Sequence, residues 1–107
     1  MTPSIKPGAS IRGLRPEMVL AWQIFSEIMA ELVPGVNAVI TEGTGGKHKI
    51  HSLHYVGQAL DLRSNTIPKA DRLRVLIAVQ RSLGPEFQFI LENADTPNEH
   101  FHVEYQP

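Results

Sequence analysis

The sequence predicts an α+β domain in which two helices pack on a small, largely antiparallel sheet. Apolar residues recur at steps of three and four over two stretches, 16–33 and 68–83, which is typical of amphipathic helices. Short runs rich in β-branched and aromatic residues lie between and after these stretches and indicate strands. A chain of 107 residues suits one core, so we expect a single domain over residues 1–107, with an N-terminal arm at 1–14.

The first helix is predicted to begin at Pro16, because proline is tolerated in the first helical turn, and to end before Pro34 and Gly35. Its apolar face has five members: Met18, Trp22, Phe25, Met29 and Leu32. A buried strand is expected over 36–41. The glycine-rich stretch 43–46 is not followed by the Lys-Ser/Thr pair of a phosphate-binding loop, and indicates a flexible rim.

A strand is predicted over 59–62, followed by a polar turn and a helix that begins near Pro68 and ends at Gly84. Five residues mark the expected buried side of this helix: Ala70, Leu73, Leu76, Ile77 and Leu83. The stretch 86–91 is expected to form a central strand, and residues 100–105 the last strand.

Composition excludes several classes of function. The formal net charge of −1 argues against a nucleic-acid partner, which would need a basic face. The absence of cysteine rules out disulfides and thiolate metal sites, so a metal site would use nitrogen and oxygen ligands. The sequence has no segment of membrane-spanning length and no signal-peptide pattern at its start, so we expect no membrane insertion.

Polar residues with metal-ligand chemistry occur in two places. Asp61 lies in an apolar strand and projects from one face of it, while Gly57 lets the preceding loop fold back with His54. His100 and His102 share one face of the last strand. If the two strands pair, Asp61 and His102 come within joint reach of one ion, which suits a divalent metal with an open coordination position.

The stretch Ser52-x-His54-x-x-Gly57-x-Ala59-x-Asp61 resembles the signature of the M15 zinc peptidases, and all five fixed positions are filled. The wider group includes the LAS-type murein endopeptidases and the hedgehog domain, and ends in a His-x-His or Glu-x-x-His element. This chain has both patterns, within residues 99–102. The similarity spans roughly residues 36–105 and implies a hedgehog-like or D-Ala-D-Ala-peptidase-like fold.

The resemblance implies that His54, Asp61 and His102 bind Zn2+, with Glu99 as the general base and His100 as a second active-site group. His100 would either help to stabilise the oxyanion or orient a metal ligand. The implied reaction is cleavage of a peptide bond in the peptidoglycan stem peptide, D-Ala-D-Ala or L-Ala-D-Glu.

The chain departs from this family in the region before its first motif. Many relatives carry a substrate-contacting arginine there, but residues 41–49 contain none, which leaves Lys47 or Lys49 as substitutes. Lysine is a point charge and lacks the bidentate geometry of arginine. Phe101 replaces a tryptophan that often precedes the last histidine.

Other interpretations stay open at the level of sequence. His48 and His51 are expected to be surface histidines, and Asp95 is a rival for the general base. The alternative functions are a non-catalytic, metal-stabilised binding module and an iron oxygenase with two histidines and a carboxylate. The family branch that fits best is a monomeric phage or prophage lysin, held in the host cytoplasm until its release to the cell wall.

Overall fold

The computed structural model describes residues 4–49 and 51–107. The elements are two long helices, one short 3-10 helix (η1) and five strands. In chain order they are β1 (Ser4–Ile5), α1 (Pro16–Leu32), β2 (Val39–Glu42), η1 (Leu53–Val56), β3 (Ala59–Arg63), α2 (Lys69–Leu83), β4 (Phe87–Glu92) and β5 (His100–Tyr105).

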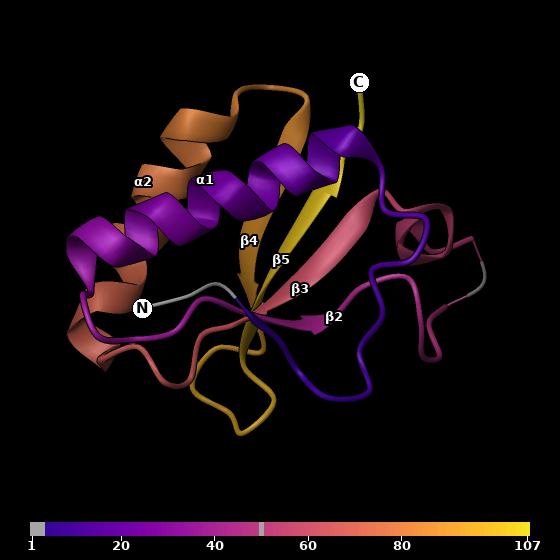
Figure 1. The fold of residues 1–107 in the computed structure, drawn as a ribbon. Coiled ribbons are helices and arrows are strands. Elements are labelled where there is room, and N and C mark those ends of the chain that lie inside the picture. Colours follow the sequence, from indigo (N-terminus) through magenta and orange to yellow (C-terminus); the bar gives the residue numbers. More distant parts are fainter. Residues whose placement is uncertain (1–3, 50) are drawn as a thin grey trace.

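The five strands form one sheet in the order β1-β2-β3-β5-β4. The pair β1–β2 is parallel and the other three pairs are antiparallel. The predicted α+β class, with two helices and a largely antiparallel sheet, is confirmed (Figure 1). The prediction that 86–91 forms a central strand is wrong, because β5 lies between β3 and β4 and leaves β4 at the edge.

The core lies between the sheet and the helices. Helix α1 begins at Pro16 as predicted, and it buries Met18, Phe25 and Met29. The ring of Phe25 packs edge-on against Phe101 of β5, with 5.8 Å between the ring centroids. Such an aromatic pair contributes about 1 kcal/mol beyond the area that it buries. Figure 1 shows α1 running across β4 and β5, with α2 beside it.

The predicted buried side of helix α2 is only partly right: Leu83 is buried and Leu76 packs against the core, but the other three predicted residues are exposed. Val75 and Val79 are fully buried, whereas Leu73 is 62% exposed and Ile77 is 39% exposed. Residues two positions apart lie about 200° apart around a helix, so a face that contains Val75 cannot also contain Leu73. The same rotation brings Arg72 to the side that faces the β4–β5 connection.

The N-terminal arm was expected to pack as coil. Its residues 4 and 5 instead form β1, and the amide of Ser4 donates a 2.8 Å hydrogen bond to the carbonyl oxygen of Ala38. The first three residues of the predicted arm lie outside the described residues. None of the helices in the described ranges has the length and apolar character needed to cross a bilayer.

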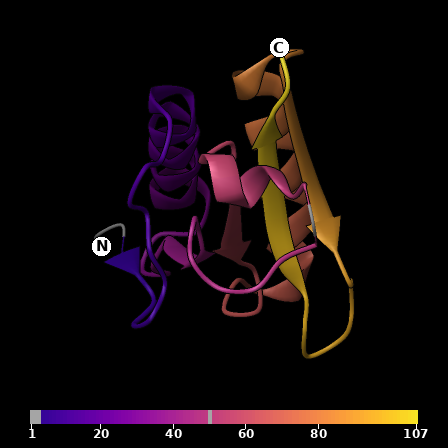
Figure 2. The same ribbon diagram turned by 90° about the vertical axis from the view of Figure 1, so that its right-hand side faces the viewer.

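Strand alternation places the candidate ligand side chains of the central strands on one face of the sheet, opposite the core. Leu60, Leu62 and Phe101 point into the helix-covered core, so Asp61 and His102 point to the opposite face. Helix η1 lies at the other end of the sheet from α2 (Figure 1), and Figure 2 shows it from that side. The open face therefore receives side chains from β3, β5 and the loop that carries η1.

Candidate metal centre

The register of the central strands places the predicted ligands side by side. Asp61 of β3 pairs directly with His102 of β5. The Nδ1 atom of His102 lies 2.8 Å from Oδ1 of Asp61, and Nε2 of His54 lies 3.3 Å from the same oxygen. These three side chains are close enough together to hold one metal ion, as predicted.

Helix η1 brings His54 to this face. The Ser52 hydroxyl accepts a hydrogen bond from the His54 amide and caps the short helix. Gly57 ends η1 with a φ of 75°, and a Cβ atom there would lie 2.2 Å from the carbonyl oxygen of Gly13. Only glycine combines this backbone angle with so close an approach. The motif spacing from Ser52 to Gly57 is therefore the geometry of a tight turn that presents His54.

The hydrogen bonds of His54 fit a bound cation. Its Nδ1 lies 2.8 Å from the carbonyl oxygen of Gly43, which can only accept, so Nδ1 carries the hydrogen. In a neutral ring Nε2 is then a lone pair, and it faces the Asp61 carboxylate. Two acceptors that face each other repel unless a proton or a metal ion lies between them. The side chain of His54 is 5% exposed, so little water is available to separate them.

His102 lies between two carboxylates. Its Nδ1 contacts Asp61 and its Nε2 lies 2.8 Å from Oε1 of Glu104. Burial lowers the pKa of His102, but the hydrogen bonds to Asp61 and Glu104 outweigh it and raise the pKa to about 9. A metal in place of the Nδ1 proton would leave Nε2–H donating to Glu104, an arrangement typical of metal-bound histidine.

Asp61 is ionised in this surrounding. Burial raises the pKa of its carboxyl, but hydrogen bonds from His102 and His54, when their facing nitrogens carry a proton, lower the pKa far below the usual range. Asp61 is therefore available as an anionic ligand at any physiological pH.

His100 lies next to this group on β5. Its Nδ1 lies 2.8 Å from the carbonyl oxygen of Asn98, and its Nε2 lies 3.1 Å from Oε1 of Glu92 and 3.7 Å from Oδ2 of Asp61. Glu92 pairs directly with His100 in the register of β4 and β5. Glu92 was not among the predicted site residues, although the hairpin pairing of the last two strands places it opposite His100.

The structure does not bring Glu99 into this cluster. Its carboxylate accepts hydrogen bonds from the Ser64 hydroxyl at 2.7 Å and the Asp95 amide at 3.0 Å, and it lies 3.1 Å from the Arg72 guanidinium. Burial raises the pKa of Glu99, but these groups outweigh it and lower the pKa. The general-base role predicted for Glu99 has no geometric support, because its carboxylate is 2% exposed and already engaged.

Strand parity explains this position. Glu99 and His102 are three residues apart, and residues an odd number apart in a strand lie on opposite faces. The rival base Asp95 is exposed, and its carboxylate lies 2.7 Å from the Lys69 amine, so it is engaged outside the cluster.

His48, expected at the surface, packs against the metal centre instead. Its ring stacks on that of His54 at 4.1 Å between centroids, and its Nδ1 lies 3.5 Å from the Glu42 carboxylate. Its Nε2 lies 2.8 Å from the carbonyl oxygen of Gly45, so the glycine-rich stretch forms the wall behind both imidazoles. His51 is exposed, as predicted.

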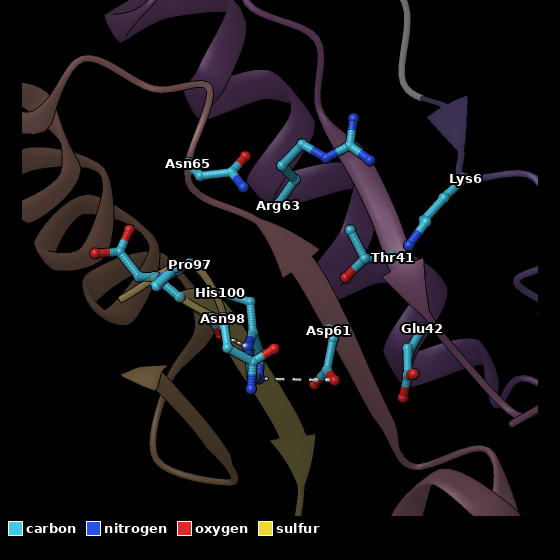
Figure 3. Close-up of a pocket in the computed structure, with 10 residues that line it drawn as sticks. Lys6, Thr41, Glu42, Asp61, Arg63, Asn65, Pro97, Asn98 and His100 are labelled. Carbon is cyan, nitrogen blue, oxygen red and sulfur yellow. Dashed lines mark hydrogen bonds and ion pairs between the residues drawn. The ribbon is translucent and has the colours of Figure 1, made fainter. Parts of the chain in front are cut away.

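A cavity of about 350 Å³ opens beside the cluster and shares Asp61 with it, and His100 and Glu99 also line it (Figure 3). Lys6 and Arg63 also line it. Within residues 4–49 and 51–107, neither basic side chain has an ion-pair partner within 4.0 Å. Arg63 pairs with His100 in the sheet register, so a positive group lies two residue pairs from Asp61 and His102.

The chain was compared with protein-family models and with curated proteins, and neither comparison gives a match.

Proposed function

We propose that this chain is a zinc-dependent metallopeptidase that cleaves a peptide bond in the stem peptide of bacterial peptidoglycan. The observation that carries the proposal is the convergence of His54 Nε2, Asp61 Oδ1 and His102 Nδ1 around one point, with both rings held through their other nitrogens. Two imidazoles and one carboxylate leave a coordination position open, which is the pattern of catalytic zinc. The resemblance of residues 52–61 to the M15 signature supports the peptidase class.

Zinc in this site would polarise the scissile carbonyl and lower the pKa of water at its open position. The protein's own contribution begins with orientation. Gly43 and Glu104 hold the two imidazole rings by hydrogen bonds, and Asp61 supplies the negative charge that retains a cation. Because these groups are fixed by strand pairing and a tight turn, little reorganisation is needed when substrate binds.

We assign the proton transfer to His100, with Glu92 as its partner. Nε2 of His100 faces the cluster, and Asn98 holds the hydrogen on Nδ1. Nε2 would accept the proton of the attacking water and then donate a hydrogen bond to the Glu92 carboxylate. It would return the proton to the leaving nitrogen. Glu99 would then be a positioning residue, since its hydrogen bonds fix the chain just before His100.

The cavity beside the cluster supports a substrate with a free carboxylate. Both candidate bonds release a residue that carries one, because the stem D-glutamate is linked onward through its γ-carboxylate and the last D-alanine ends the peptide. Arg63 is two residue pairs from Asp61 and His102 along the paired strands, and a charge-assisted bond to such a carboxylate would fix the released residue. This arginine, with Lys6, would take the place of the arginine missing from residues 41–49.

The proposal is tested with purified protein loaded with zinc. Mass spectrometry of muropeptides identifies the bond that is cut, and turbidity of chloroform-treated Gram-negative cells follows lysis. His102→Ala should lose both zinc and cleavage, whereas His100→Gln should keep zinc and lose about 100-fold or more in kcat. Zinc bound at one equivalent with no cleavage of any muropeptide would refute the peptidase and leave a metal-stabilised binding module.

A further inference from the structure

A second set of ligand atoms lies beside the first. One ligand atom from each of His100, Glu92 and Asp61 lies within 4.8 Å of the other two. We propose that they form a second, weaker site for a divalent cation, bridged to the first site by the Asp61 carboxylate.

The orientation of the His100 ring supports this site. The carbonyl oxygen of Asn98 can only accept, so Nδ1 of His100 carries the hydrogen and a neutral ring presents its Nε2 lone pair. This lone pair faces Glu92 at 3.1 Å and Asp61 at 3.7 Å. Three acceptors directed at one point are stabilised by a positive charge there, which a divalent cation supplies.

The distances fit a tetrahedral cation. Ligand atoms that each lie about 2.1 Å from a tetrahedral ion are about 3.4 Å from one another. The distances from His100 Nε2 to Glu92 and to Asp61, 3.1 Å and 3.7 Å, lie on either side of that value. The site needs only small side-chain movements to take the ion.

Asp61 has one oxygen for each site. Its Oδ1 contacts His54 and His102, whereas its Oδ2 faces His100. A bridging carboxylate of this kind holds two ions about 3.5–4 Å apart in two-metal hydrolases.

The second site should be the weaker one. The first site has two imidazoles with side chains at most 14% exposed. The second has one imidazole, and the Glu92 side chain is 41% exposed and must lose conformational freedom to bind. The first cation also adds repulsion for the second.

Occupation of the second site would inhibit cleavage. This consequence rests on the proposed function, in which His100 and Glu92 carry the proton. A cation on His100 Nε2 occupies the lone pair that must accept the proton, so excess zinc would stop turnover while the first site stays filled.

Isothermal titration calorimetry of metal-free protein with Zn2+ alone tests the site. Wild type should bind two equivalents, the second more weakly. Glu92→Gln should weaken the second event at least about tenfold and leave the first within about threefold. Glu86→Gln, an exposed glutamate just before β4, is the matched control and should bind like wild type. His51→Ala tests whether an exposed histidine supplies the second event instead.

A single equivalent at saturating zinc would overturn the proposal. So would a second event that persists in Glu92→Gln, or one that is lost in His51→Ala. In muropeptide cleavage assays, the zinc concentration that halves turnover should match the second dissociation constant, and turnover unaffected by filling that site would overturn the inhibitory role. If the protein cleaves no muropeptide, the proposed function fails while the calorimetry still decides the second site.

Discussion

Glu99→Gln separates a structural role for this residue from a catalytic one. The substitution removes a negative charge that lies 3.1 Å from the Arg72 guanidinium, and it can place an amide donor opposite the Ser64 hydroxyl or the Asp95 amide. Removing one partner of a buried ion pair costs about 3–5 kcal/mol. Because the Arg72 side chain keeps 18% exposure and some hydration, we expect a loss of about 3 kcal/mol.

That loss should be visible as a fall in Tm of about 12–24 °C, since 1 kcal/mol corresponds to about 4–8 °C in a small domain. Zinc stoichiometry should stay at the wild-type value. Below the new Tm, kcat should stay within a few-fold of wild type, because the Glu99 carboxylate is buried and already engaged by Ser64, Asp95 and Arg72. Circular dichroism melts, metal analysis and muropeptide turnover measure these three quantities on one preparation.

A general base gives the opposite pattern. In that case Glu99→Gln would keep its Tm and lose about 100- to 10,000-fold in kcat. That outcome would refute the assignment of the proton to His100. If Glu99→Gln does not fold, Ser64→Ala removes a single hydrogen bond to the carboxylate and should lower Tm without lowering kcat. Glu31→Gln, on the exposed side of α1, is the control for a lost surface charge.

Three further predictions concern the metal centre and the cavity. The pKa of His102 is raised to about 9, so its contribution to the stability of metal-free protein should be fully present below about pH 6.5 and be lost as pH rises through 9. Zinc-loaded protein should not show this loss in pH-dependent melts. Gly57→Ala should lower both Tm and zinc affinity, because the added Cβ atom has no room. Gly35 has a similar φ of 90° but open space around it, so Gly35→Ala should lower Tm and leave zinc affinity unchanged. Replacing the free carboxylate of the released residue by an amide should lower kcat/KM about 10-fold or more. Arg63→Gln should abolish this preference for the carboxylate over the amide substrate, whereas the control Arg81→Gln should retain it.

The fold was largely predictable because its elements have local signals. Proline at position 16 and the apolar spacing of α1 specify a helix, and the alternation in β5 specifies a strand. The order of strands has no such signal. The local sequence patterns of β4 and β5 do not indicate which of the two strands pairs with β3. The edge position of β4 therefore depends on tertiary contacts. The rotation of α2 likewise depends on which of several apolar residues meets the sheet.

The three candidate metal ligands were predictable because the position of each depends on residues close to it in the sequence. Gly57 fixes the turn that presents His54, and strand parity turns Asp61 and His102 to one face. His48 had no comparable signal, because its place depends on a loop whose path is fixed by distant contacts. A Cβ atom on Gly43 would lie 2.2 Å from the carbonyl oxygen of Ser10 in the N-terminal arm. The loop that carries His48 is therefore packed against a segment more than thirty positions away in the sequence.

The same parity rule decides which acid can act at the metal. In a continuous strand, a residue on the metal face must be an even number of positions from His102, which admits His100 and Glu104 and excludes Glu99. Glu92 reaches this face from the neighbouring strand, opposite His100. The spacing Glu-x-x-His would place both groups at one metal only if the chain left the extended conformation between them. Here β5 begins at His100 and is regular from there, and the carboxylate of Glu99 lies with Arg72, which favours the proposed assignment of the proton transfer to His100.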